Sequence, residues 1–185
     1  MIDRRNALAG MAAMFGTALF APIARAAAGQ VVPISDGAAS VAVFTTEQRA
    51  LMTALSERVM PTTDTPGAIA AEVPQFIEKL LADWALPEDR VPIVAGLDSI
   101  EARCRADYKV AGAKASAAQH DALLTLAMND QLPGGKAFFE RFRQLVVTGY
   151  FTSEIGIMQE REYLPVPGSY DGAFPYANVN KVYSA

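Results

Sequence analysis

The chain has 185 residues, of which 51% are hydrophobic, and a formal net charge of −4 at pH 7. This length and apolar content suit one domain with a substantial core. Because the net charge is negative and no run of Lys or Arg occurs, the chain lacks the basic face that phosphate binding requires, and no nucleic-acid partner is expected.

The first 26 residues have the layout of an export signal. Arg4 and Arg5 precede an apolar, Ala-rich stretch, and Ala24 and Ala26 form the small-x-small site that a signal peptidase accepts. The apolar stretch is about 15 residues, shorter than the roughly 20 that span a bilayer. The paired arginines resemble a twin-arginine signal, which serves folded cargo. Asn6-Ala7 departs from that pattern, so ordinary secretory export and an uncleaved anchor are the alternatives.

Helical patterns begin after a predicted linker over residues 27–44. Thr45 and Gln48 form a capping box, which predicts a helix from there to near Pro61. A second helix is expected from Pro74 to Trp84, because Pro is favoured in the first turn.

Three further helices are predicted. One lies within residues 88–112, with Pro92 tolerable only in its first turn or as a kink. Ser116 and Gln119 form a second capping box, and that helix should run to about Met128. A fifth helix should end at Gly149 as its C-cap. The apolar residues that repeat at helical spacing are Leu51, Leu55, Val59, Phe76, Ile77, Leu80, Leu81, Ile93, Leu97, Ile100, Phe138, Phe142, Leu145 and Val146.

The predicted fold is therefore all-α: a compact bundle of about five to six helices over residues 45–159. Residues 160–185 are rich in Pro, Gly and aromatic rings, and we expect an extended strap. Its rings should pack either on the bundle or on another protein.

Few residues could carry chemistry. The chain has no dinucleotide-binding glycine motif and no haem-attachment motif, and one Cys with one His cannot assemble the usual zinc sites. His120, in the first turn of the fourth helix, is predicted to be a surface residue. Cys104 should be either a buried small hydrophobe or one half of an intermolecular disulfide. No catalytic, cofactor-binding or metal-binding residue is predicted, although the fold could still bring two carboxylates together.

The segment Gly149–Gly156 is a predicted helix–helix corner. Gly149 should end one helix, and Thr152 or Ser153 should cap the next turn, with Glu154 near its positive end. A tight corner with Tyr150 and Phe151 in the core would account for the segment by itself.

Four segments together resemble the gluconate 2-dehydrogenase subunit 3 family, in the family's order and over roughly residues 45–175. They are Glu57–Pro61 with Asp64–Ala68, Val73–Leu81, the Gly149–Gly156 corner, and Pro167–Gly172. The atypical signal and the lone Cys104 are departures from the family.

The resemblance implies a complex of three parts. A large catalytic subunit of the glucose-methanol-choline type holds FAD, a multihaem cytochrome c passes electrons to the membrane, and the small subunit holds no cofactor. The small subunit assists the folding and twin-arginine export of its partner, and the complex lies in the periplasm, associated with the inner membrane. The residues expected at the partner interface are Tyr150, Phe151, Glu154, Tyr170 and Asp171. An independent periplasmic protein that binds a small ligand, or a stand-alone enzyme, is the alternative.

Overall fold

The computed structural model describes residues 39–163, 175, 177 and 183–184. This part of the chain holds five α-helices, and the prediction of an all-helical bundle is confirmed. The helices are α3 (Thr46–Val59), α4 (Val73–Asp83), α5 (Pro87–Tyr108), α6 (Ala117–Met128) and α7 (Gly135–Phe151). A 3-10 turn, η1 (Gly112–Lys114), precedes α6, and a π-helical segment, η2 (Gly156–Glu160), follows α7.

Both predicted capping boxes are present. Thr45 Oγ1 accepts from Gln48 N, while Gln48 Oε1 accepts from Thr45 N at 2.9 Å. Ser116 and Gln119 make the same reciprocal pair at the start of α6. Each box supplies acceptors to backbone N–H groups that a helix start leaves unpaired. The two helices therefore begin where the sequence predicts.

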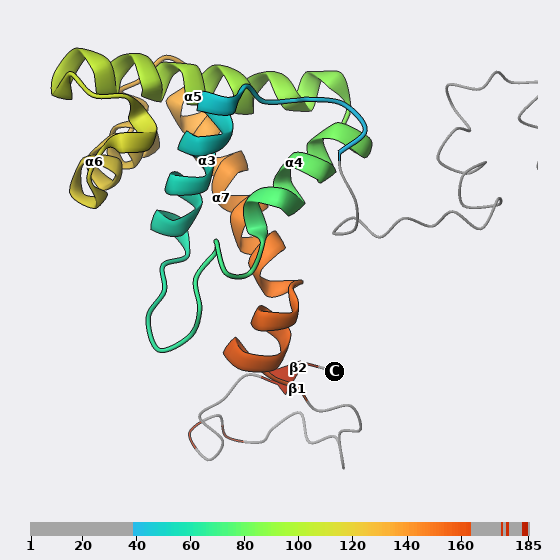
Figure 1. The fold of residues 1–185 in the computed structure, drawn as a ribbon. Helices are drawn as coiled ribbons and strands as arrows, with labels where there is room; N and C mark the ends of the chain where they lie inside the picture. The colour runs from blue at the N-terminus through green and yellow to red at the C-terminus, as the bar shows by residue number, and fades with distance from the viewer. Residues whose placement is uncertain (1–38, 164–174, 176, 178–182, 185) are drawn as a thin grey trace, which may run out of the picture. The chain divides into compact units, whose positions relative to one another are not determined.

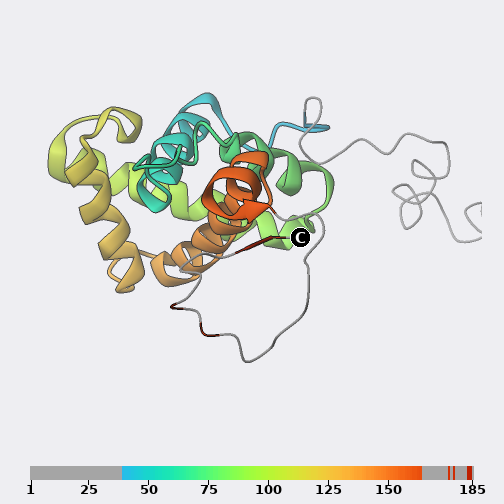
Figure 2. The ribbon, with the colours of Figure 1, turned by 90° about the horizontal axis from the view of Figure 1, so that it is seen from below.

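The long helix α5 runs across the top of Figure 1, and α3, α4 and α7 descend from it. Seen from below in Figure 2, α7 lies between α6 on one side and α4 on the other, in contact with both. Helix α5 continues through Pro92 into a further four turns, so this Pro lies inside the helix rather than in its first turn.

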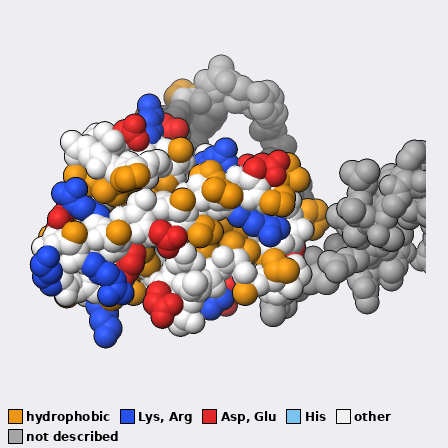
Figure 3. Space-filling model, turned by 90° about the horizontal axis from the view of Figure 1, so that it is seen from above, with side chains coloured by type: hydrophobic (Ala, Val, Ile, Leu, Met, Phe, Trp, Pro, Cys, Tyr) orange, Lys and Arg blue, Asp and Glu red, His pale blue; other side chains and the backbone are white. Residues whose placement is uncertain are grey.

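The core is one continuous apolar cluster to which every α-helix contributes. Its largest fully buried side chains include Leu51, Met52, Leu55, Ile77, Ile93, Leu97, Ile100, Leu123, Phe138, Phe142 and Tyr150. Phe138 and Phe142, one turn apart on α7, stack with ring centroids 5.2 Å apart. Over the opposite face of α5, seen from above in Figure 3, apolar side chains are interspersed with acidic and basic ones.

Gly149 does not end its helix, and the prediction that it is a C-cap is wrong. Helix α7 continues through Gly149 to Phe151, and Gly149 is buried where α4 crosses it. A Cβ at this position would lie 2.7 Å from Phe76 Cδ1 and 3.2 Å from Val73 Cγ1. Gly149 is required for close helix packing, and not for a left-handed backbone.

Two short strands lie at the ends of the C-terminal segment. β1 (Glu162–Tyr163) pairs in parallel with β2 (Tyr183–Ser184). Most residues between them lie outside the described part of the chain.

Candidate partner-binding surface

Three of the predicted interface residues lie in the described part of the chain, and they differ in how far they are exposed. The Tyr150 side chain is buried, with 2% of it exposed, and its hydroxyl donates to the Pro66 carbonyl at 2.8 Å. Its ring belongs to the core, so it cannot touch a partner in this arrangement. Phe151 is half-buried, and Glu154 is exposed. Those two remain candidates for contact with a partner.

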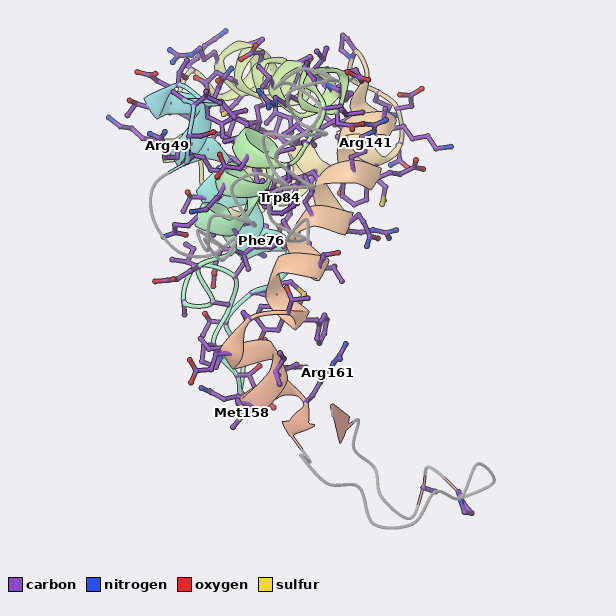
Figure 4. The ribbon with its side chains drawn as sticks, turned by 90° about the vertical axis from the view of Figure 1, so that its right-hand side faces the viewer. Arg49, Phe76, Trp84, Arg141, Met158 and Arg161 are labelled. Atoms are coloured by element: carbon purple, nitrogen blue, oxygen red, sulfur yellow. The ribbon has the colours of Figure 1, made fainter. Side chains whose placement is uncertain are left out.

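Phe151 lies between two neighbours at the lower end of the molecule. Its ring meets the Tyr150 ring edge-on, with centroids 5.3 Å apart. The Arg161 guanidinium lies over the Phe151 ring, 5.1 Å from its centroid. Arg161 and Met158 extend from this end in Figure 4, and 54% of Met158 is exposed. The Arg161 cation is thus held in place by an aromatic ring.

The corner after α7 is held by Ser153, as predicted. Ser153 Oγ accepts from Gly156 N at 3.0 Å and donates to the Tyr150 carbonyl at 2.6 Å. A Cβ on Gly156 would lie only 2.0 Å from that same carbonyl oxygen. The chain therefore turns too tightly here for any residue other than Gly at position 156.

A second family-like segment, the loop between α3 and α4, is organised by Glu57. The Glu57 carboxylate accepts from Thr62 N at 3.0 Å, from Thr62 Oγ1 at 2.8 Å and from Ile69 N at 3.0 Å. A Cβ on Gly67 would lie 2.4 Å from Glu57 Oε1. The Glu57 carboxylate therefore stabilises the conformation of the loop.

The loop and the corner lie together in space, although more than 80 residues separate them. The Tyr150 hydroxyl, in the corner, donates to the Pro66 carbonyl in the loop. In the other direction, Thr65 Oγ1 of the loop donates to Glu160 Oε2, just after the corner, at 2.6 Å. Two of the segments that carry the family resemblance thus form one structural unit. Sequence reasoning found both segments without indicating that they touch.

A groove of about 680 Å³ lies higher up, between α4, the start of α5 and α7. Its apolar lining comes from Leu80, Leu81, Trp84, Ala85, Ile93 and Leu145. Its polar lining comes from Asp89, Glu140, Arg141, Arg143 and Gln144. Figure 4 faces this side of the molecule, with Trp84 and Phe76 on α4 and Arg141 nearby on α7.

Helix α4 has two apolar stripes, and the bundle buries only one. Val73, Ile77 and Leu81 are buried at successive i, i+4 positions. Phe76, Leu80 and Trp84 have the same i, i+4 spacing and form a second apolar stripe beside the first. Phe76 and Leu80 are half-buried, and 59% of Trp84 is exposed. Leu80 and Trp84 of this second stripe line the groove.

The charges around the groove are only partly paired. Arg141 donates to Asp89 Oδ1 at 2.9 Å. Arg143 lies 6.0 Å from the centroid of the Phe139 ring. Within the described part of the chain, neither Arg143 nor Glu140 makes an ion pair. The groove therefore has an apolar lining beside two charged side chains, Arg143 and Glu140, that make no ion pair among the described residues.

His120 is not on the surface, contrary to the prediction. Only 4% of it is exposed, and Nε2 lies 2.7 Å from the Gly112 carbonyl oxygen. Since a carbonyl only accepts hydrogen bonds, Nε2 carries the proton and donates it. The ring links α6 to η1, which is a structural role that sequence periodicity does not reveal.

Cys104 is also buried, with 0% exposed, and is a free thiol in this chain. Burial in the core raises the pKa of its thiol above the usual value. This placement favours the buried-hydrophobe alternative over a bridge to another chain. Among the described residues, no group of His, Cys, Asp and Glu is arranged to hold a metal ion.

The remaining predicted residues lie outside the described part. These are Arg4 and Arg5 of the signal, Ala24 and Ala26 at its cleavage site, and Tyr170 and Asp171 in the C-terminal segment. Within the described residues, no helix has both the length and the apolar character needed to cross a bilayer.

The described residues form a small helical bundle with a groove between α4, the start of α5 and α7. The model of one family, gluconate 2-dehydrogenase subunit 3, matches residues 46–168, which is more than half of the chain. The chain belongs to this family, and is by that membership a small subunit of a dehydrogenase complex. No curated protein and no solved structure matches it significantly.

Proposed function

We propose that this chain is the non-catalytic small subunit of a periplasmic, membrane-associated, FAD-dependent sugar or alcohol dehydrogenase. It binds a large flavoprotein of the glucose-methanol-choline type, assists its folding and accompanies it through twin-arginine export. A multihaem cytochrome c receives the electrons. FAD belongs to the flavoprotein and haem c to the cytochrome, and this chain contributes no cofactor.

The observation that carries this proposal is the family match over residues 46–168, which includes every α-helix of the bundle. The groove supports it, because its apolar lining includes the exposed Trp84, and exposed apolar patches typically mark interfaces. Several of the described acidic side chains also hold structure: Glu57 binds a loop, while Glu78, Asp89 and Asp121 pair with arginines.

Co-expression tests the escort role. The flavoprotein encoded with this chain should be soluble, flavin-loaded and periplasmic only when the full chain is present. Changing Arg4 and Arg5 together to Lys should leave both proteins in the cytoplasm, because the export receptor reads the arginine pair. Cell fractionation with flavin fluorescence measures this. A flavoprotein that folds and reaches the periplasm without this chain would contradict the proposal.

A second candidate function is an independent periplasmic protein that binds a small ligand. The groove favours it, because about 680 Å³ lies within the usual size range of small-molecule sites. Native mass spectrometry of the purified chain separates the two functions. A retained small molecule and no flavoprotein would favour the second.

A further inference from the structure

We infer that the groove between α4 and α7 receives an amphipathic helix of the flavoprotein subunit, with an acidic residue of that helix facing Arg143. This rests on the proposed function for the identity of the partner. The assignment of the groove and the chemistry of the partner's helix come from the structure alone.

The apolar part of the groove indicates the partner's main contact. Leu80 and Trp84 form one wall, and Leu145 of α7 stands opposite. A face of this kind between two helices suits a third helix, whose apolar residues at i, i+3, i+4 and i+7 enter the groove. Trp84, 59% exposed, is the expected anchor, because Trp is enriched among residues that dominate binding.

The charges beside the groove limit the partner further. Arg141 is already neutralised by Asp89. Arg143 and Glu140, one turn apart on α7, make no ion pair within the described residues. A complementary helix therefore places an Asp or Glu against Arg143 and a Lys or Arg about one turn away, against Glu140. This arrangement also fixes the direction of the helix along α7.

The lower end of the molecule offers a weaker alternative surface. Glu160 there accepts from Thr65, and the Arg161 guanidinium lies 5.1 Å from the Phe151 ring centroid, closer than the 6.0 Å between Arg143 and the Phe139 centroid. The groove combines apolar side chains from two helices with a charge of each sign that makes no ion pair among the described residues, so we assign the helix to the groove.

Site-specific photo-crosslinking in the intact complex tests the assignment. Benzoylphenylalanine replaces Trp84 in the full chain, co-expressed with its flavoprotein, and in a control replaces Met128. Met128 on α6 is also apolar and 49% exposed but does not line the groove. We expect Trp84 to cross-link to a flavoprotein helix that carries an Asp or Glu within a turn of the labelled residue, and Met128 not to cross-link.

Charge reversal provides a second measurement that does not depend on Trp84. Arg143→Glu should reduce the flavoprotein recovered with the tagged chain by roughly tenfold, because a carboxylate would then face a carboxylate. The matched control is Lys114→Glu, an exposed cation in η1 that makes no ion pair in the described structure. Circular dichroism of each variant separates lost binding from lost folding.

The outcomes distinguish this inference from the proposed function. If the flavoprotein is recovered but does not cross-link from Trp84, or if Trp84 cross-links only to a second copy of this chain, the groove assignment fails while the proposed function stands. Equal recovery with Arg143→Glu and Lys114→Glu also overturns the assignment. If the wild-type chain recovers no flavoprotein at all, the proposed function itself fails.

Discussion

Gly149 shows how a single residue sets the spacing between two helices. A Cβ there would meet Phe76 and Val73 on α4. Gly149→Ala should therefore destabilise the chain by about 1–3 kcal/mol, the usual cost of overpacking a well-packed core. Urea unfolding followed by circular dichroism measures this.

The double variant Gly149→Ala with Phe76→Ala identifies the cause. Truncating Phe76 to Ala removes Cδ1, the atom closest to the new methyl group, so the double variant should be more stable than the sum of the two single effects predicts. Strict additivity would mean that the loss comes from something other than this contact.

The thiol of Cys104 should be inert in the folded chain. It is buried, and burial raises its pKa above the usual value, so the reactive thiolate is scarce near neutral pH. Ellman's reagent should label it many times more slowly in the native protein than in 6 M guanidinium chloride. Rapid native labelling, or a covalent partner lost on Cys104→Ser in non-reducing gels, would restore the intermolecular disulfide as an explanation.

At the scale of single elements, the end of α5 contains a strained position. Lys109, its C-cap, has φ of 59°, a left-handed conformation that costs most residues free energy but not Gly. Lys109→Gly should raise the free energy of unfolding by about 1 kcal/mol, because Gly does not incur the left-handed penalty. Lys109→Ala, which loses the same side chain without relieving the backbone, is the control, and equal stability of the two variants would refute the argument. Urea unfolding measures both.

Helices α3 and α6 are joined by the Arg58–Asp121 ion pair at 2.7 Å. The Arg58 hydrogen bond holds the pKa of Asp121 below its usual value. Since the folded pKa lies below the unfolded one, the pair stabilises the fold above the unfolded pKa, about 4. That stabilisation is lost as the pH falls through the folded pKa.

Asp121→Asn should therefore lower stability at pH 7 and have little effect near pH 2. Because 49% of the Asp121 side chain is exposed, solvent screening limits the loss at pH 7 to about 0.5 kcal/mol or less. Urea unfolding of both proteins at the two pH values measures the difference. An equal deficit at both values would show that the ion pair is not the cause.

The elements that local chemistry determines were predictable from the sequence. Thr45 and Ser116 predict the starts of their helices because each side chain accepts a hydrogen bond from the backbone N–H three residues later. The role of Gly149 and the burial of His120 were not, because each depends on an element distant in sequence. The burial of Tyr150 was one of the alternatives that the sequence left open, and its hydrogen bond to Pro66 was not predicted. The sequence also shows the apolar face of α4 without showing that the bundle covers only half of it.

At the scale of the whole molecule, the described chain combines a complete core with one uncovered apolar wall. Every α-helix contributes to the core, so the bundle does not need a partner to acquire a hydrophobic interior. On the second stripe of α4, by contrast, Phe76 packs against Gly149 of α7, while Leu80 is half-buried and 59% of Trp84 is exposed. We expect this of a small subunit of a dehydrogenase complex: the core of the bundle stabilises the chain, and its surface binds the partner.

We propose that this chain functions while bound to a flavoprotein. Purification of the chain from native membranes and periplasm with a tag at Ala185, followed by flavin absorbance, haem absorbance and partner masses, tests this. We expect a yellow complex that contains one large flavoprotein in a fixed ratio to this chain. A colourless, stable protein recovered without a flavoprotein would contradict it.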